Sequence, residues 1–560
     1  MARSTHTVTN QPPPLTGYDV FGADRALVSA VRRHLGPGLL DEACEELSGL
    51  GRAAGSAQVQ EWATQADENP PRLRTHDRYG NRVDEVDFHP AWHRLLGKGV
   101  GAGLTGAWTR PGGHVRRAAG FLVWTQAEAG NGCPLSMTHA AVPALRADPQ
   151  LAAEWEPRLT SAVYDRGLRP ARLKAGALFG MAMTEKQGGS DLRANTTLAV
   201  PLAEAGTYAL TGHKWFCSAP MSDGFLVLAQ ADPSGSSGSS GEETGEEEGG
   251  LTCFLVPRAL EDGTRNVFRL QRLKEKLGNR SNASAEVEFD GTWARRIGAP
   301  GRGVRTVIDM VAATRLDCVL GSAGLMRQAV AQAVHHCAYR EAFGGRLVDK
   351  PLMRNVLADL ALESEAATTL ALRLAAAYDD GGEQERALLR IAVPAAKYWV
   401  TKRCTPVVVE AAECLGGNGY VEESGMPRLV RESPLNSIWE GAGNVQALDV
   451  VRALRREPSA LHAYLQEVGQ ARGADHRLDG AIKGLLTELA DLDGIEGRAR
   501  RLTERFALVL QGSLLVRFAP PEVADAFCAS RLGGDSGAAF GTLPHSLDLA
   551  AVVERARPRL

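Results

Sequence analysis

Two helical regions flank one short stretch of β-type sequence, and this order is the strongest constraint on the fold. Residues 20–180 are rich in Ala and Leu, and the composition changes near residue 181. Apolar or alternating segments then predict strands at 207–211, 224–229 and 285–289. From about residue 304 apolar residues recur at three- and four-residue steps, which predicts a long helix through Leu316 to Ala333. We therefore expect an α+β fold, mainly α, with a β domain between two helical domains.

The same changes in composition divide the 560 residues into four expected domains. Further long helices are expected after Pro351 and through Pro394 to Glu413. The domains are an N-terminal extension with a helical domain (1–180), a β domain (181–297), a helical bundle (298–450) and a C-terminal helical domain (451–560). The Ser/Gly/Glu tract 233–250 has almost no apolar residue and is expected to be a mobile hairpin loop. Its acidic charge is most simply solubilising, and a regulatory role is the alternative.

Overall composition excludes several classes of protein. The formal net charge of −3 gives the whole molecule no electrostatic bias toward nucleic acid. The nine cysteines form no CxxC motif or Cys/His cluster, which favours a reducing cytoplasm and argues against a structural metal site. The first residues contain no apolar signal region, and the chain has no run of eighteen apolar residues. We therefore expect neither secretion nor membrane spanning.

One carboxylate, Glu440, lies in the segment Asn436–Asn444 between a bulky apolar pair and a run of small residues. A carboxylate removes a proton from a weak carbon acid only if it is dry and close to its target. Ile438 and Trp439 can form a dry wall, and Gly441 leaves room for a flat ligand. The alternative is that a Glu followed by Gly marks a helix end or a solvated turn.

A second segment with chemical potential, Met183–Asp191, lies where the helical texture gives way to strands. Hydroxyl groups beside two adjacent glycines suit close contact with a planar cofactor and a phosphate. The segment matches neither a GxGxxG fingerprint nor a Walker loop, so the pattern alone implies no nucleotide. A polar β-turn is the alternative.

Three shorter motifs follow along the chain. Phe216–Ser218 puts an aromatic ring beside a hydroxyl, as a ring system needs, although any buried strand can have this sequence. Arg340–Gly344 ends the long helix, where Arg can bind a pyrophosphate or simply complement the helix dipole. Leu415–Tyr420 has three glycines after a helix, more than a C-cap requires, which suggests close approach by a ligand or another backbone.

In order and spacing, over roughly residues 50–450, these motifs resemble the acyl-CoA dehydrogenase flavoproteins. The resemblance implies FAD, and a fold of helical domain, β-barrel and four-helix bundle. It implies that Glu440 is the catalytic base, with Arg315 of the Thr314-Arg315 pair beside it. It places these residues at the cofactor: Met183, Thr184, Gly189, Ser190, Asp191, Phe216, Cys217, Ser218, Arg340, Phe343, Gly416, Gly417, Gly419, Ile438, Trp439, Gly441 and Asn444. Arg340 and Phe343 match the part that reaches the FAD of a neighbouring subunit, which implies an oligomer, expected to be a homotetramer.

Longer motifs resemble the AidB branch of that family: MTEKQGGSD, GHKWF, KLGNRSNAS, ECLGGNGY and NSIWEG. This second resemblance covers essentially the whole chain, including the extra C-terminal helical domain. It implies binding of double-stranded DNA, protection from alkylating agents and weak dehydrogenase activity. The general family has Thr at Ala442 and Tyr at Trp439, so the flavin loses a hydroxyl and the acyl pocket narrows. Both departures argue against a long acyl-CoA thioester as the natural ligand.

The C-terminal domain is where the resemblance places DNA binding. From Arg452 to Leu560 the chain has 15 basic and 14 acidic residues, so its net charge is only about +1. Phosphate contacts through Lys and Arg provide most non-specific DNA affinity. A tetramer could align the arginines into a basic stripe, and the candidates are Arg452, Arg455, Arg456, Arg498, Arg500, Arg501 and Arg505. The alternative is a solvated helix face.

Three hypotheses fit these motifs. The first is a DNA-associated flavoprotein that intercepts or oxidises alkylating agents. The second is a metabolic dehydrogenase acting on a short or branched acyl-CoA. The third is a flavin-stabilised DNA-binding protein whose chemistry is vestigial.

Overall fold

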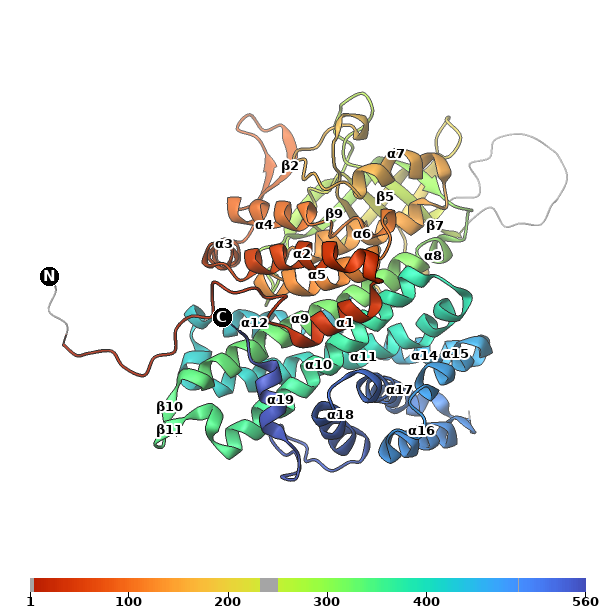
Figure 1. Cartoon of the computed structure of the whole chain (residues 1–560). Coiled ribbons are helices and arrows are strands. Elements are labelled where there is room, and N and C mark those ends of the chain that lie inside the picture. The colour runs from red at the N-terminus through yellow and green to blue at the C-terminus, as the bar shows by residue number, and fades with distance from the viewer. Residues whose placement is uncertain (1–4, 232–249, 492, 560) are drawn as a thin grey trace. The chain divides into compact units, whose positions relative to one another are not determined.

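A computed structural model describes residues 5–231, 250–491 and 493–559 of the chain (Figure 1). The chain forms two compact units, and each is assembled from separate segments. The first unit, here the bundle unit, contains residues 1–60, 114–127 and 315–560. The second, here the barrel unit, contains residues 61–113 and 128–314.

Seven strands of the barrel unit form one sheet, whose bounds are β3 (Phe179–Ala182), β4 (Leu198–Pro201), β5 (Thr207–Ser218), β6 (Gly224–Ala231), β7 (Gly250–Pro257), β8 (Arg269–Leu273) and β9 (Ser284–Ile297). Five of them close into a ring in the order β6–β4–β5–β9–β7, because β7 pairs back onto β6. β3 extends the β4 edge of β6, and β8 extends the β7 edge of β9. The expected β-barrel is therefore confirmed. Residues 233–249 of the expected hairpin loop lie outside the described residues.

The sheet of the barrel packs against a hydrophobic core on each of its two faces, and β6 contributes side chains to both cores. Phe225 and Val227 belong to the core inside the barrel, whereas Leu226 and Leu228 belong to a second core outside it. Helices α6 (Gly132–Leu145) and α7 (Pro149–Leu159) complete that outer core, for example through Trp155. This double burial explains why β6 is a continuous apolar run and does not alternate.

One expectation for the N-terminal region was wrong, because residues 20–180 are not helical throughout. Strands β1 (Arg72–His76) and β2 (Arg82–Asp87) form an antiparallel hairpin before α4 (Pro90–Gly101). The carboxylate of Asp77 accepts hydrogen bonds from the backbone N–H groups of Tyr79 and Asn81 and so closes the turn. Local turn chemistry thus overrides the Ala-rich helical context.

The bundle unit is built on three long helices, α9 (Ile308–Tyr339), α10 (Pro351–Asp380) and α11 (Glu383–Cys414), of which the first begins in the barrel unit. The predicted helices after Pro351 and through Pro394 are thus confirmed. The remaining helices up to residue 456 are α1 (Arg25–His34), α2 (Pro37–Ala54), α3 (Ala57–Glu68), α5 (Gly113–Ala127), α8 (Gly303–Thr306), α12 (Met426–Glu432), α13 (Leu435–Ile438) and α14 (Gly443–Arg456). The fold class is confirmed as mainly α with a β-barrel.

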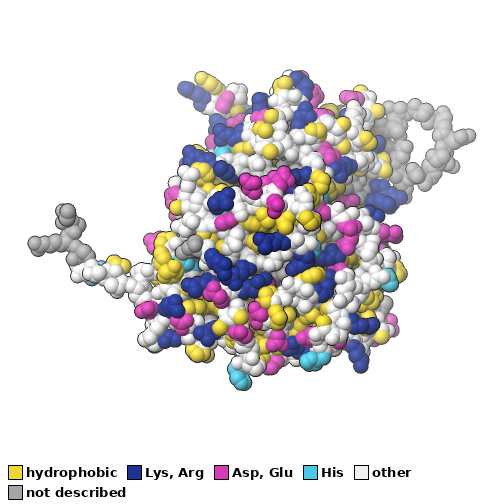
Figure 2. Space-filling view, viewed as in Figure 1, with side chains coloured by type: hydrophobic (Ala, Val, Ile, Leu, Met, Phe, Trp, Pro, Cys, Tyr) yellow, Lys and Arg dark blue, Asp and Glu magenta, His cyan; other side chains and the backbone are white. Residues whose placement is uncertain are grey.

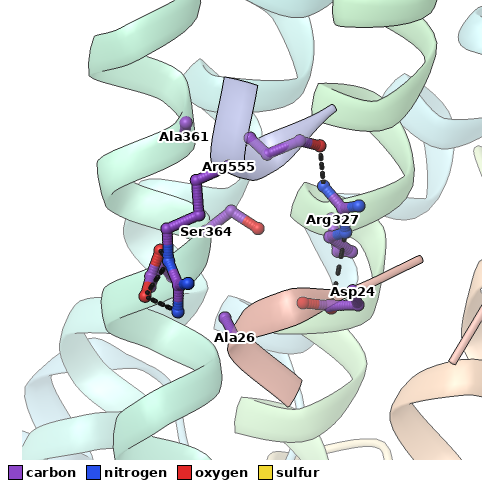
Figure 3. A pocket seen from close by; sticks show the side chains of 8 residues that line it. Asp24, Ala26, Arg327, Ala361, Ser364 and Arg555 are labelled. Carbon is purple, nitrogen blue, oxygen red and sulfur yellow. Dashed lines mark hydrogen bonds and ion pairs between the residues drawn. The ribbon is translucent and has the colours of Figure 1, made fainter. Parts of the chain in front are cut away.

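The C-terminal segment is helical and packs on the long helices, as α15 (Pro458–Gly469), α16 (His476–Leu489), α17 (Ile495–Phe518), α18 (Pro521–Phe527) and α19 (Leu549–Ala556). Buried ion pairs attach it: Arg373 of α10 contacts Glu467 of α15 at 2.8 Å. Figure 3 shows Arg327 of α9 bonded both to Asp24 and to the backbone of α19, where Ala556 accepts at 2.8 Å. One guanidinium therefore holds segments from both ends of the chain.

A buried ion pair joins α5 to α9 inside the bundle unit. Arg117 donates to both carboxylate oxygens of Asp317, at 2.6 and 2.8 Å, and only 4% of either side chain is exposed. A bidentate pair of this kind tolerates burial because each charge is neutralised by the other.

Arg117→Leu should lower the free energy of unfolding by ~3–5 kcal/mol, because Asp317 is left charged and unpaired. Arg117→Leu combined with Asp317→Leu should recover most of that loss. The exposed pair between Arg74 and Glu85 provides the control, since Arg74→Leu should cost less than ~1 kcal/mol. Urea denaturation of the FAD-loaded protein compares these variants with the wild type. Equal losses in the single and the double variant would contradict the assigned pairing.

Candidate functional site

The first two flavin motifs lie side by side in the barrel unit. The backbone N–H of Trp215 donates to the Thr184 carbonyl at 2.9 Å. Close by, the N–H of Lys186 donates to the imidazole of His213 at 3.0 Å. The segment after β3 therefore runs against β5, which places Thr184 next to Trp215, the residue before Phe216.

A β-bulge in β5 decides which of its side chains are available. The pairing register with β9 shifts between Lys214 and Cys217, so that both of these side chains are buried. Trp215 and Phe216 fall between them, and 51% of Phe216 is exposed. The Cys217 thiol lies in the barrel core, so only the backbone of this predicted cofactor residue can contact a ligand.

A buried ion pair that sequence reasoning missed supports this turn. Lys214 Nζ contacts Glu185 at 2.8 Å, and neither side chain is exposed. Glu185 also accepts hydrogen bonds from the backbone and hydroxyl groups of Thr196 and Thr197. Burial raises the pKa of Glu185, but these hydrogen bonds and the Lys214 charge lower it by more, so the carboxylate stays ionised. The pair fixes the backbone next to Thr184.

The barrel residues fit one side of a flavin. Thr184, Ser190 and Ser218 offer hydroxyl groups, and Phe216 offers an exposed ring. A Cβ on Gly189 would lie 2.3 Å from the Thr184 hydroxyl oxygen, so this close packing requires glycine. Asp191 is exposed at the end of the segment, and the Met183 carbonyl accepts a hydrogen bond from Asn195. Hydroxyl donors beside an aromatic face match the mixed polar and apolar surface of a flavin ring.

Glu440 lies on a tight turn of the bundle unit, between α13 and α14. Its φ is +56°, and that of Gly441 is +90°, so the chain turns through the left-handed region at both residues. Gln446 donates to the carbonyls of Glu440 and Gly441, at 3.0 and 2.8 Å. The Trp439 indole N–H donates to Asn436 at 2.9 Å. The turn is therefore fixed through its backbone, while Ile438 remains exposed.

Lys397 of α11 lies beneath this turn, and sequence reasoning missed it. Its ammonium donates to the carbonyls of Trp439 and Gly441 at 2.7 and 2.6 Å, and only 1% of the residue is exposed. Burial lowers the pKa of Lys397, and the nearby Cys318 and Glu440 oppose that shift. The lysine thus holds the two carbonyls that bracket Glu440.

Arg315, predicted to lie beside the base, is hydrogen-bonded to the backbone of Glu440. Its guanidinium contacts Asp449 of α14 at 2.6 Å and the Glu440 carbonyl at 3.4 Å. Asp449 also contacts Arg390 and Arg452, each at 3.0 Å. This four-residue cluster connects α9, α11 and α14 around the turn. Arg315 reaches the backbone of Glu440, which makes it a positioning residue in this structure.

The predicted pyrophosphate motif forms a two-residue hairpin, β10 (Glu341–Ala342) and β11 (Gly345–Arg346). Phe343 and Gly344 at its tip both have positive φ, as the favoured hairpin turns require. As a result 94% of Phe343 is exposed. Arg340 donates to the backbone carbonyl of Asn10, so this guanidinium has an internal acceptor in the single chain.

The glycine motif after α11 forms a short 3-10 turn, Gly416–Tyr420. Gly416 has a φ of +61°, as a helix C-cap requires, and a Cβ on Gly419 would lie 2.0 Å from the Ala412 carbonyl oxygen. Backbone conformation at Gly416 and close packing at Gly419 therefore account for the presence of glycine at these two positions. Gly417 has open space around it, and 92% of Tyr420 is exposed. Asn444, at the start of α14, accepts a hydrogen bond from Arg500.

The candidate DNA-binding arginines are mostly paired within the chain. Arg455 contacts Glu496, and both Arg501 and Arg505 contact Glu488. Arg498 donates to three backbone carbonyls at the end of α16, and Arg500 to the Tyr398 hydroxyl. Arg452 contacts Asp449. On the face shown in Figure 2, basic and acidic side chains are interspersed.

A closed β-barrel between helical stretches of chain, together with a carboxylate on a fixed turn of a helical bundle, defines the acyl-CoA dehydrogenase class of flavoproteins. Residues 10–166 match the family described as adaptive response protein AidB N-terminal domain. Residues 180–292 match the acyl-CoA dehydrogenase middle domain, and residues 301–455 its C-terminal domain.

Two relatives and one solved structure extend these matches. The AidB protein of Escherichia coli K12 is 43% identical over 95% of both chains. Acyl-CoA dehydrogenase family member 11 of Caenorhabditis elegans is 30% identical over 90% of this chain and 84% of its own. The crystal structure of C. elegans ACDH-11 in complex with C11-CoA superposes with a TM-score of 0.84, at 28% identity, over 95% of this chain and 94% of that one.

The chain belongs to the acyl-CoA dehydrogenase family, in its AidB branch. It is a flavin-dependent oxidoreductase by family, and FAD is the cofactor. Among the described residues, no helix is both long enough and apolar enough to cross a membrane. Within the same part of the chain, His, Cys, Asp and Glu side chains form no group of three that could hold a metal ion.

Lys397→Met should reduce turnover about 100-fold, because freeing the turn displaces the Glu440 carboxylate by an ångström or so. FAD content should stay the same, since both hydrogen bonds of Lys397 are made to backbone carbonyls of the turn. Lys483→Met, on an exposed face of α16, is the matched control. Rates are measured with any substrate that reduces the flavin. Unchanged turnover in Lys397→Met would show that the turn keeps its shape without the lysine.

Proposed function

We propose that this chain oxidises a C–H bond beside an electron-withdrawing group, with Glu440 as the base. The supporting observation is the turn between α13 and α14, where Lys397, Gln446 and Arg315 all bind backbone carbonyls. Such bonds fix the backbone on both sides of Glu440. FAD, when bound, supplies the acceptor for the hydride. The residues that the resemblance places at the cofactor are part of this proposal. The division into four domains, 1–180, 181–297, 298–450 and 451–560, is proposed separately.

The substrate class we propose is a CoA thioester with a short or branched acyl chain. The thioester carbonyl acidifies the neighbouring C–H bond, which is what a carboxylate base requires. The structure of ACDH-11 with C11-CoA supports the CoA class. Trp439 stands where the wider family has Tyr, and its indole is fixed by Asn436 at 2.9 Å. A fixed bulky ring beside the base favours a smaller acyl group.

We also propose that the protein assembles as a homotetramer in the cytoplasm. Phe343 and Tyr420 are more than nine-tenths exposed in the single chain. Large aromatic side chains at such exposure are typical of surfaces that another subunit covers. Both lie in motifs that the resemblance assigns to subunit contacts at FAD.

Glu440→Gln should retain FAD and lose substrate-dependent flavin reduction by a factor of ~10²–10⁴, the usual contribution of a general base. Anaerobic bleaching of the flavin is followed with a panel of CoA thioesters of increasing acyl length. Glu68→Gln, at the exposed end of α3, is the control. Full reduction of Glu440→Gln at the wild-type rate would remove Glu440 from the role of base.

A second function, protection of double-stranded DNA from alkylating agents, is favoured by the match to the adaptive response family and by a basic helix end. Arg452, Arg455 and Arg456 are exposed at the end of α14, in a position to reach phosphates. The acidic partners of Arg452 and Arg455 reduce the available charge. We therefore propose that DNA binding weakens as the salt concentration rises and does not depend on the base sequence.

Arg455→Gln combined with Arg456→Gln should reduce the slope of log affinity against log salt by about 0.9 for each phosphate that the protein no longer neutralises. Binding of a labelled duplex to the intact protein is measured from low to moderate salt. Arg74→Gln, on the β1–β2 hairpin, is the matched control. An absence of binding at low salt, or an unchanged slope in the double variant, would remove this helix end from the DNA proposal.

A further inference from the structure

A cavity of about 110 Å³ lies within the barrel unit, and its lining contains none of the residues predicted to bind FAD, although Ala219 of the lining directly follows Ser218. Its walls come from four places in the sequence: β2 with the start of α4, the link before η2 (Ala171–Leu173), the start of β3 and the loop between β5 and β6. A cavity of this size exceeds what one water molecule needs several times over. It is large enough for a small organic molecule.

One wall of the cavity is aromatic. Phe88 and Trp92 stack with ring centroids 3.9 Å apart, and His93 packs edge-on against Trp92 at 5.1 Å. Tyr164 stacks on His93 from the other side, at 6.0 Å. Flat rings that line a pocket favour a flat ligand, because stacking adds to the burial of apolar area.

The polar side of the cavity is electrically balanced. Lys174 and Asp223 form a buried ion pair at 2.9 Å. Lys174 also donates to the carbonyls of Asp165 and Gly167, so its hydrogen-bonding capacity is filled. The Lys174–Asp223 pair therefore forms part of the cavity wall, and each of its charges is already neutralised by the other.

Two buried donors of the lining have no hydrogen-bond partner among the described residues. They are the indole N–H of Trp92 and the hydroxyl of Ser222, on residues that are 4% and 1% exposed. Buried polar groups are nearly always paired, and an unpaired donor is destabilising unless water or a ligand binds it. Trp92 can only donate, so whatever pairs with it must present an acceptor.

Burial raises the pKa of Asp223 to about 6 although Lys174 lowers it, and the two groups form the ion pair described above. His93 and Tyr164 suit recognition better than catalysis. His93 Nδ1 lies 2.7 Å from the Tyr164 hydroxyl. Burial and the nearby Arg166 lower the pKa of His93 to about 4, so the imidazole is neutral at physiological pH. Burial likewise raises the pKa of Tyr164. Neither His93 nor Tyr164 changes charge near neutral pH, so both are hydrogen-bonding groups of fixed charge.

We propose that the Trp92–Ser222 cavity binds a small planar compound, a single aromatic ring that carries a carbonyl or carboxylate oxygen. The ring would lie against the Phe88–Trp92 wall, and the oxygen would accept from Trp92 and Ser222. Arg166, exposed at the cavity, would favour a carboxylate over an amide. The site is separate from the Glu440 turn in the sequence and contains none of the residues predicted at FAD.

The test uses the full-length FAD-loaded protein and ligand-observed fluorine NMR. The probes are para-fluorobenzamide and para-fluorobenzoate, which share the ring and differ in charge, with fluorobenzene as the probe that has no acceptor. We expect both acceptor probes to bind with a dissociation constant of about 1 mM or tighter, and fluorobenzene to bind at least about threefold more weakly. Tighter binding of the benzoate would identify Arg166 as a contributor.

Trp92→Phe and Ser222→Ala should each weaken the acceptor probes by about three- to tenfold, since each removes one hydrogen bond. Trp62→Phe, on α3, is the matched control and should change nothing. FAD content and thermal midpoint show that each variant is folded. If a variant fails to fold, crystals of the wild-type protein soaked with para-bromobenzamide locate the probe directly through the anomalous signal of bromine.

Several outcomes would overturn the proposal. They are no binding up to about 10 mM of either acceptor probe, equal binding of fluorobenzene, binding unaffected by both variants, and a bromine peak elsewhere in the molecule. Displacement of the probe by a CoA thioester that reduces the flavin would also overturn it, since that would place the probe in the redox site.

Discussion

The turn that carries Glu440, in the bundle unit, depends on one buried ammonium. Lys397 is removed from water, and the loss of its hydration is offset by the carbonyls of Trp439 and Gly441. Those carbonyls are available only because the chain turns through the left-handed region between them. The lysine and the turn therefore require each other, and the direction of the Glu440 side chain follows from both. Arg315 and Asp449 then attach the turn to the helices on either side.

In the barrel unit, a buried charge pair likewise fixes a turn. Glu185 and Lys214 are fully buried beside the Met183–Asp191 segment, and their partners are mostly backbone and hydroxyl groups. In each unit a buried charge organises a loop through hydrogen bonds to backbone or hydroxyl groups. Such rigidity around a loop is what a binding or catalytic site requires.

Sequence reasoning identified candidate residues in contiguous segments and missed the distant residues that hold those segments. The segment around Glu440, the two motifs predicted at the flavin and the alternation of helical and β regions are visible because each is a local pattern. Lys397 is separated from the turn by about forty residues and lies within a long helix, where lysine is usually solvent-exposed. The pairing of Arg501 with Glu488 is likewise invisible, because it depends on how α16 and α17 pack. The β1–β2 hairpin was missed because its turn is short and its surroundings are rich in Ala.

The left-handed backbone conformation of Glu440 lowers stability, whereas the proposed reaction requires a carboxylate at this position. A left-handed conformation costs a non-glycine residue about 1 kcal/mol or more, and glycine adopts it without that cost. By conformation alone, Glu440→Gly would be favoured, and directed evolution for thermal tolerance would select it. The protein selected in this way would be more stable and would have lost the base that we propose. On that proposed role, the glutamate marks a position at which function has prevailed over folding.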